Sequence, residues 1–318
     1  MNAKTKGTLC GIVAAVTYGT NPLGALSLYA DGINSASVLF YRYGLAVVLL
    51  GALMLARRES LRVSWRELGI IATLGVLFAA SSLSLYLSFH YMDAGIASTI
   101  LFVYPIMVAV IMALFFHEKT SLVTVLSIVL SLCGIALLYR GGDGAVLSTA
   151  GVLLVLVSSL TYAVYIVIVN RSTLAMSPIK LSLYVMAFGT LTIILYSLTG
   201  DANRLQLLTT WSQWGYAWLL ALLPTVISLV MMTIAVHNIG STPTAILGAL
   251  EPITAVVIGV TVFSEAFTAR LACGIVLVLV AVLLIVAGKN LHPQRVVRPL
   301  VRPFVRSGLY LRNHFWWK

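Results

Sequence analysis

The chain has 318 residues, of which 60% are hydrophobic and only 9% are charged, and its mean hydropathy is +1.03. Soluble globular domains carry about 25% charged residues. The composition therefore excludes a water-soluble enzyme or binding domain and indicates a protein that crosses a membrane several times.

Ten apolar segments are long enough to cross a bilayer as helices, which requires roughly 17 to 25 residues each. The connections between them hold turn-forming residues, and the longest internal connection, 199–214, is too short for a soluble domain. The first segment stays apolar for too long to be a secretory signal and lacks a small-residue cleavage site. The predicted segments are 7–29, 36–56, 67–90, 94–116, 121–139, 149–170, 180–198, 215–237, 242–263 and 269–288.

Basic residues predict the orientation, because Lys and Arg accumulate on cytoplasmic segments. With the N-terminus inside, sixteen of the twenty basic residues fall on cytoplasmic segments and three on the opposite side, while Arg42 lies within a helix. Both ends are therefore predicted to be cytoplasmic, in an inner membrane. The net charge of +11 follows from this topology and from a basic tail, and no nucleic-acid partner is expected.

The tail, residues 289–318, holds seven of the basic residues, and four arginines alternate with Val, Leu and Phe. Such a segment can lie on an anionic leaflet of the lipid bilayer. Pro299 and Pro303 argue against one continuous helix, and a solvated tail is the alternative. The four arginines are Arg295, Arg298, Arg302 and Arg306.

An internal repeat organises the rest of the chain. A shift of 147 residues aligns Pro105 with Pro252 and Glu118 with Glu265, with twelve identities in 49 positions, and a shift of 144 aligns "VTYG" with "LTYA". Each half holds five helices, and an odd number inverts the second half in the membrane. The sequence thus predicts an all-α membrane protein of two inverted five-helix repeats, 1–140 and 149–288. In this plan the substrate site lies near the midplane between the halves.

Four stretches carry a family resemblance: "AAVTYGTNPLGA", "YRYGLAVVLL", "VYPIMVAVIMALFFHEKTS" and "LEPITAVVIGVTVFSEAFTA". They resemble the drug/metabolite transporter superfamily, in particular its paired EamA-type domains, over residues 7–288. The resemblance implies ten helices in two inverted repeats and import or export of small metabolites. One departure is that His117, rather than a glycine, precedes the acidic Glu118 at the end of the fourth helix.

Glu251 is an acid about ten residues into the ninth helix, next to Pro252. An acid at that depth costs on the order of 2.5–3.5 kcal/mol, so it is expected to face protein or water. Its first-half counterpart is Tyr104. Three interpretations remain open: a proton carrier, a partner for a cationic substrate group, or an acid that is hydrogen-bonded to hydroxyls and holds the fold together.

Two further ionisable residues have open interpretations. Arg42 lies deep in the second helix, where it either binds a carboxylate or phosphate, snorkels outward, or pairs with Asp31 or Asp93. His90 ends the third helix and is either an interfacial cap or a proton relay.

The other cavity candidates are aromatic and amide residues expected where inner helices face each other. Small-molecule sites are mostly apolar with a few polar tips, although each of these tyrosines could equally be a packing residue. They are Tyr18, Asn21, Tyr86, Tyr104, Tyr162, Tyr165 and Tyr184.

Negative observations limit the function classes. The sequence has no Walker-type phosphate loop and no HExxH or Cys/His cluster, so no catalytic residue, metal or cofactor is expected. Cys10, Cys133 and Cys273 are expected to be small buried hydrophobic residues.

The expected function is secondary transport of a small-molecule substrate, an amino acid or related compound, by export. Alternatives are a translocase for nucleotide sugars or lipid-linked carriers, a channel, and an intramembrane enzyme; the oligomeric state is not predicted.

Overall fold

The computed structural model describes residues 2–117, 122–138, 148–172, 174 and 176–288, so the basic tail and Glu118 lie outside the described part. Within these ranges the chain is all-helical, with nine apolar spans long enough to cross a membrane and a shorter apolar helix, Leu122–Leu138. The nine spans are Ala3–Ala30, Ser35–Ala56, Trp65–Ser88, Ala94–Phe115, Thr149–Arg171, Pro178–Ser197, Trp211–Ile239, Pro243–Val262 and Ala269–Val286. They confirm the predicted fold class.

The first repeat comprises seven helices, because two of its spans are interrupted. They are α1 (Ala3–Tyr18), α2 (Asn21–Ala30), α3 (Ser35–Ala56), α4 (Trp65–Ser88), α5 (Ala94–Leu101), α6 (Tyr104–Phe115) and α7 (Leu122–Leu138).

Two spans of the second repeat are interrupted as well. Its elements are α8 (Thr149–Arg171), α9 (Pro178–Ser197), the 3₁₀ turn η1 (Asp201–Asn203), α10 (Trp211–Ala221), the π-helical segment η2 (Leu222–Ile227), α11 (Ser228–Ile239), α12 (Ser241–Leu247), α13 (Leu250–Val262) and α14 (Ala269–Gly288).

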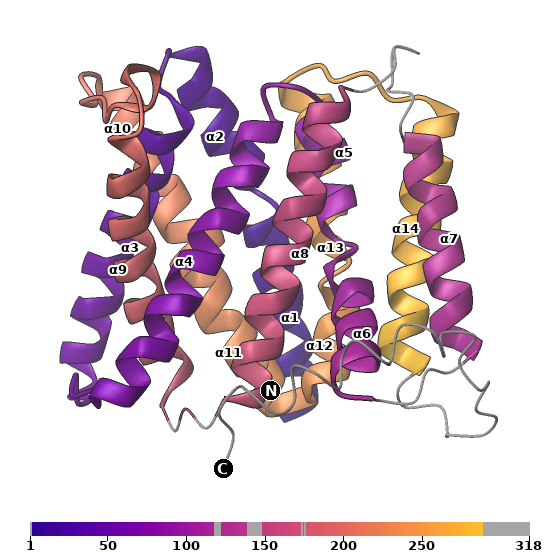
Figure 1. Ribbon diagram of the computed structural model, residues 1–318, viewed down its shortest axis with the longest axis horizontal. Coiled ribbons are helices and arrows are strands. Elements are labelled where there is room, and N and C mark those ends of the chain that lie inside the picture. Colours follow the sequence, from indigo (N-terminus) through magenta and orange to yellow (C-terminus); the bar gives the residue numbers. More distant parts are fainter. Residues whose placement is uncertain (1, 118–121, 139–147, 173, 175, 289–318) are drawn as a thin grey trace, which may run out of the picture.

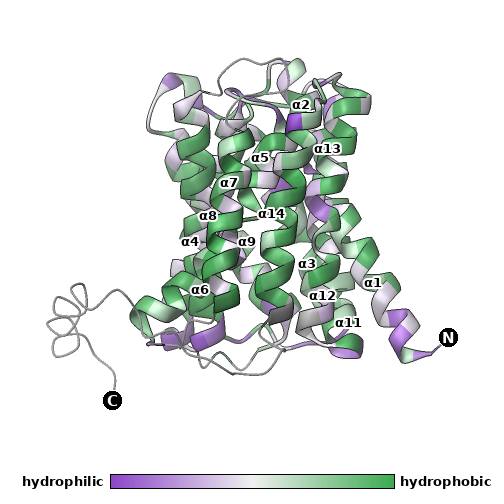
Figure 2. Ribbon diagram, turned by 90° about the vertical axis from the view of Figure 1, so that its right-hand side faces the viewer, coloured by the Kyte–Doolittle hydropathy of each residue, from purple (hydrophilic) through white to green (hydrophobic). Residues whose placement is uncertain are grey.

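The two repeats are interlocked rather than side by side. The most extensive helix contacts all join the halves: α7 with α14, α1 with α11, α4 with α8, and α3 with α9. In Figure 1, α3 and α9 close one edge of the bundle and α7 and α14 close the other, with the remaining helices between them. Figure 2 shows apolar residues along most of the helix lengths and hydrophilic ones mainly towards the ends, as expected for spans in a bilayer.

Backbone details repeat between the halves as the 147-residue shift predicts. His117 and Ser264 are related by that shift, and both adopt left-handed backbone, with φ of 52° and 56°. The breaks between α5 and α6 and between α12 and α13 also occupy equivalent positions. The correspondence in conformation supports the inverted repeat independently of residue identity.

Prolines at three of the interruptions leave a carbonyl without the N–H that it would have in an α-helix. These prolines are Pro22, Pro105 and Pro224. In hydrocarbon such a carbonyl must find a partner within the protein, and in each case a side chain supplies it. The bonds run from Asn21 Nδ2 to the Tyr18 carbonyl (2.8 Å), from Ser159 Oγ to the Leu101 carbonyl (2.7 Å) and from Thr225 Oγ1 to the Leu220 carbonyl (2.9 Å).

The cysteines do not follow the expectation of burial: Cys10 is half-buried, while Cys133 and Cys273 are exposed and all three are free. Their helices α7 and α14 bury small residues such as Gly134 and Gly274 against each other. The exposed thiols therefore lie on the faces turned away from that contact, where a small apolar side chain is compatible with lipid.

Ser159→Ala is expected to lower the free energy of unfolding by about 1 kcal/mol, the scale of interhelical hydrogen bonds in membranes. It leaves the Leu101 carbonyl without its donor, whereas Thr161→Ala on the same helix removes a hydroxyl that bonds only within α8. Unfolding of the purified protein in mixed micelles measures both. Equal stability of the two variants would contradict the role given to Ser159.

Candidate functional site

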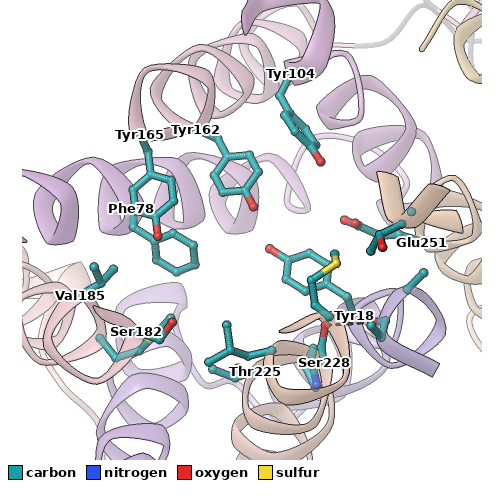
Figure 3. Close-up of a pocket in the computed structure, with 18 of the residues that line it drawn as sticks. Tyr18, Phe78, Tyr104, Tyr162, Tyr165, Ser182, Val185, Thr225, Ser228 and Glu251 are labelled. Carbon is teal, nitrogen blue, oxygen red and sulfur yellow. Dashed lines mark hydrogen bonds between the residues drawn. The ribbon is translucent and has the colours of Figure 1, made fainter. Parts of the chain in front are cut away.

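A cavity of about 270 Å³ lies in the interior, and both repeats line it. Its lining extends towards the side of the bundle where α1 begins, here called the N-terminal side, through Leu50, Ser182, Val236 and Thr244. Helix α3 begins at Ser35 on the opposite side of the bundle, and Arg42 is the lining residue of α3 that lies nearest to that beginning. The cavity is thus placed asymmetrically between the two faces, and Figure 3 shows the side chains that line it.

One wall of the cavity is aromatic. Ring centroids are 4.8 Å apart for Tyr104 and Tyr162, 5.8 Å for Tyr162 and Tyr165, and 5.6 Å for Tyr165 and Phe78. Figure 3 shows the hydroxyls of the three tyrosines directed towards the cavity, with Tyr18 facing them from across it. The wall offers ring faces for apolar contact and hydroxyls for hydrogen bonds.

Arg42 is buried, with 2% of its surface exposed, and lines the cavity. Its Nε donates to Thr225 Oγ1 at 3.0 Å and its Nη1 to the Tyr86 hydroxyl at 2.9 Å. Of the three interpretations left open by the sequence, snorkelling and a pair with Asp31 or Asp93 are wrong. Arg42 lies on the inward face of α3, where its neighbours one turn away are also buried, so its side chain cannot reach either surface.

Asn21 and Tyr86 are not in the cavity lining, contrary to prediction, but stand behind Arg42. The Tyr86 hydroxyl accepts from the guanidinium and donates to Asn21 Oδ1 at 3.1 Å, while Asn21 Nδ2 bonds the Tyr18 carbonyl. This chain of bonds holds the guanidinium against the interrupted end of α1.

Tyr184 and His90 do not line the cavity. The prediction of Tyr184 as a cavity residue is therefore wrong, whereas the position of His90 fits the interfacial cap rather than the proton relay. The Tyr184 hydroxyl donates to the Leu61 carbonyl at the N-terminal side. His90 follows the last residue of α4, is exposed, and stacks on Tyr29 with its Nε2 3.0 Å from Ser35 Oγ. Partial burial of the ring lowers the His90 pKa from its ordinary value.

Glu251 is the second residue of α13, immediately after the break that follows α12. Its carboxylate lines the cavity (Figure 3) and has no hydrogen-bond donor or ion-pair partner among the described residues. Arg42 attracts it electrostatically across the cavity without forming an ion pair. The site therefore holds one cation and one acid that do not neutralise each other by contact.

Gly19 lets the interrupted first span approach Glu251. A Cβ at this position would lie 2.6 Å from the Glu251 carbonyl oxygen and 2.6 Å from Thr254 Cβ. Only a residue without a side chain lets the two backbones approach this closely. Gly19 therefore determines how near the end of α1, with Tyr18, lies to Glu251 at the start of α13.

Thr225 and Ser228 are site residues that the sequence reasoning missed. Both line the cavity; Thr225 accepts from Arg42, and Ser228 Oγ donates to the Ala14 carbonyl at 2.9 Å. The available signal was Pro224 inside an otherwise continuous apolar span, since a proline there forces a local irregularity. The resulting π-helical turn belongs to a class that often occurs at functional sites.

Comparison with known proteins bears on the identity of this site. Residues 5–140 and 149–287 each match the EamA-like transporter family. The chain belongs to this family. It is therefore a multi-pass membrane transporter of the drug/metabolite superfamily and not an enzyme, as the sequence resemblance implied.

Individual relatives of this EamA-like transporter have general names. An uncharacterized transporter of Archaeoglobus fulgidus is 22% identical, over 60% of this chain and 70% of its own, and one of Synechocystis is 28% identical, over 70% and 67%. The uncharacterized transporter YvbV of Bacillus subtilis is 26% identical over 53% and 55%. One crystal structure matches 91% of this chain and all of its own with a TM-score of 0.65 and 17% identity, which shows a shared fold alone.

Gly19→Ala is expected to destabilise the protein by about 1–3 kcal/mol, the usual cost of overpacking, and to weaken substrate transport by moving α1 away from Glu251. Gly44→Ala is the matched control, because nothing lies within 4 Å of a Cβ built there. Thermal unfolding and flux are measured for both. A Gly19 variant that behaves like the Gly44 variant would show that the close approach is unimportant.

Proposed function

We propose that the protein is a secondary transporter that moves a small metabolite, an amino acid or a related compound, across the inner membrane, in the direction of export. The observation that carries this proposal is the cavity between two inverted repeats, which is where secondary transporters hold their substrates. Transport by alternating access requires such a cavity to open to each side in turn.

The size of the cavity supports a small substrate. At about 270 Å³ it is slightly smaller than the range of roughly 300–1,000 Å³ that is usual for ligand pockets. A nucleotide sugar or lipid-linked carrier needs considerably more space than this, so the observation favours the metabolite over the larger alternatives.

The channel alternative is less well supported. Channels select ions with rings of charge or filter loops, whereas this cavity has a single acid and a single base on different helices.

The distribution of basic residues supports both ends of the ten-helix bundle being cytoplasmic. In that orientation the cavity reaches the cytoplasmic side, from which an exporter loads its substrate.

Energy for uphill transport is proposed to come from an ion gradient, since the sequence has no Walker-type ATP site. Glu251 is the candidate for coupling because it is the acid in the cavity, either through a proton or through a cationic substrate group. His90 is not a candidate, because it lies after the end of α4 and does not line the cavity. The basic tail is proposed to contact anionic lipids.

Flux into proteoliposomes tests the function. After a thermal-shift screen against a metabolite panel, uptake of radiolabelled hits is expected to saturate with concentration, because one cavity must open and close for each molecule. Flux that remains linear to high millimolar concentration, or single-channel currents in a planar bilayer, would favour a channel. A cysteine replacing the exposed Leu207 is expected to react only from the side opposite the cytoplasm.

A further inference from the structure

We propose that the cavity is built for a ligand with both charges, in which Glu251 binds an ammonium group and Arg42 binds a carboxylate. The inference rests on the proposed transport function and specifies how its substrate is recognised. The two groups line one cavity, are the acid and the base of its lining, and do not form an ion pair with each other.

The hydrogen bonding of the two side chains differs in a way that fits these roles. Arg42 is braced through Nε and Nη1 by Thr225 and Tyr86, so its guanidinium is fixed in position before a ligand arrives. Glu251 has no donor among the described residues, so its carboxylate is available to the cavity. A buried carboxylate without a partner is costly, and an ammonium group supplies the missing charge and donors.

The internal repeat shows that the charges are a departure from symmetry. The shift of 147 residues relates Glu251 to Tyr104, the shift of 143 relates Arg42 to Val185, and all four line the cavity. Each charged group therefore has an uncharged counterpart in the other repeat. This arrangement gives the cavity one charged dipole against apolar walls, which suits a small zwitterion with an apolar side chain.

Tyr86 and Asn21 are positioning residues in this proposal. They do not line the cavity, but their hydroxyl and amide oxygen form the chain that fixes the guanidinium. Removing the Tyr86 hydroxyl should loosen Arg42 without changing any charge in the cavity.

The test uses leucine, leucinamide, which lacks the carboxylate, and 4-methylpentanoate, which lacks the ammonium group. Binding to the purified protein is measured by calorimetry at several pH values, after a screen of the twenty amino acids selects another triad if leucine is not the best ligand. The zwitterion is expected to bind at least tenfold more tightly than either analogue.

Two variants assign the charges. Glu251→Gln is expected to weaken leucine at least tenfold at every pH while leaving 4-methylpentanoate unchanged. Tyr86→Phe is expected to weaken leucine and 4-methylpentanoate but not leucinamide. Tyr184→Phe, whose hydroxyl is remote from the cavity, is the control and should change none of them.

Three results would overturn the assignment. They are equal affinity of the zwitterion and its one-charge analogues, binding that survives Glu251→Gln while only pH-driven flux is lost, or no amino acid binding below about 10 mM. The second result identifies a proton carrier instead. If the protein transports other metabolites but no amino acid, the ligand assignment fails while the transport function stands.

An independent observation concerns α3 and α9, one from each repeat, which pack together along one edge of the bundle. On the opposite side, the loop after α9 is bound to the start of α3. The backbone N–H of Asn34 donates to Gln206 Oε1 at 2.6 Å, and the backbone N–H of Gln206 donates to Ser37 Oγ at 2.8 Å. The Tyr41 hydroxyl donates to the backbone carbonyl of Gln206. The loop 199–210 and these residues are called the far clamp.

The N-terminal side has an equivalent arrangement, called the near clamp, in which the loop 57–64 after α3 is bound to the start of α9. Ser177 Oγ donates to Glu59 Oε2 at 2.6 Å, Lys180 Nζ to the Arg62 carbonyl at 2.5 Å, and Tyr184 to the Leu61 carbonyl. A shift of 143 residues relates the helix residues of the two clamps: Asn34 to Ser177, Ser37 to Lys180 and Tyr41 to Tyr184.

We infer that α3 and α9 form a fixed frame that stays closed at both faces while the other helices move. If the clamps were gates, the hydrogen bonds of one clamp would be formed on the closed side and those of the other would be broken on the side towards which the cavity extends. Here both clamps are formed together although the cavity reaches only the N-terminal side. The changes of access therefore fall on the interrupted helices around the cavity.

Reversible cross-linking tests the frame in a protein in which Cys10, Cys133 and Cys273 are replaced by Ala. The pairs Ser37→Cys with Gln206→Cys and Glu59→Cys with Ser177→Cys are bridged by a short thiol-specific linker. Flux of each bridged protein is expected to remain within twofold of the reduced protein. A bridge between Ser182→Cys on α9 and Thr244→Cys on α12, both of which line the cavity, is the comparison expected to stop flux.

Loss of flux on bridging either clamp, with recovery on reduction, would show that the clamp opens during transport and would overturn the inference. Failure of a clamp pair to cross-link would show that its residues are not adjacent in the membrane, with the same consequence. A failure of the transport proposal would look different, because the unbridged cysteine variants would then have no saturable flux.

Discussion

The structure depends on one constraint, that backbone N–H and C=O groups in a hydrocarbon interior must be hydrogen-bonded within the protein. Interrupting a helix releases carbonyls, and four spans are interrupted in the part of the chain that the structure describes. The side chains that restore these hydrogen bonds, Asn21, Ser159 and Thr225, come from the same level as the cavity. Two of them also belong to the Arg42 network, since Thr225 accepts from Arg42 directly and Asn21 accepts from Tyr86. Two of the three side chains that satisfy the interrupted backbone therefore also position Arg42 in the site.

Interruption also explains how a bundle of apolar helices forms a cavity with a few polar tips. Continuous helices pack through regular side-chain contact and leave little space. The break before α13 places Glu251 at the start of a helix, and the π-helical turn at Pro224 directs Thr225 towards Arg42. Gly19 allows the chain between α1 and α2 to lie closer to the backbone of Glu251 than a residue with a side chain could. Each feature is a local departure from helical geometry, and each has an identifiable residue as its cause.

The sequence was sufficient to predict the helices and the repeat. Of the nine cavity residues that it predicted, six line the cavity. Hydrophobic length specifies spans directly, and Glu251 was conspicuous because an acid in hydrocarbon is costly. The failures have a common origin. In a span that is apolar on all sides, periodicity does not reveal which face turns inward, so Tyr184 and Tyr86 could not be separated from Tyr162 and Tyr165. Arg42 was ambiguous for the same reason: whether it reached the surface depended on the rotation of α3, which packing against α9 and α10 determines.

The symmetry of the fold and the asymmetry of the site meet at equivalent positions. The repeat relates Tyr18 to Tyr162, and these two face each other across the cavity as like residues. It also relates Arg42 to Val185, by the shift of 143 that joins α3 and α9, and both line the cavity. An inverted repeat gives equivalent paths to the two membrane faces because each half can adopt the conformation of the other. A binding group that followed this symmetry would occur twice, once in each half. Confining the cation to the first repeat and the acid to the second leaves a single binding polarity, so a ligand would keep one orientation while the helices around it exchange roles.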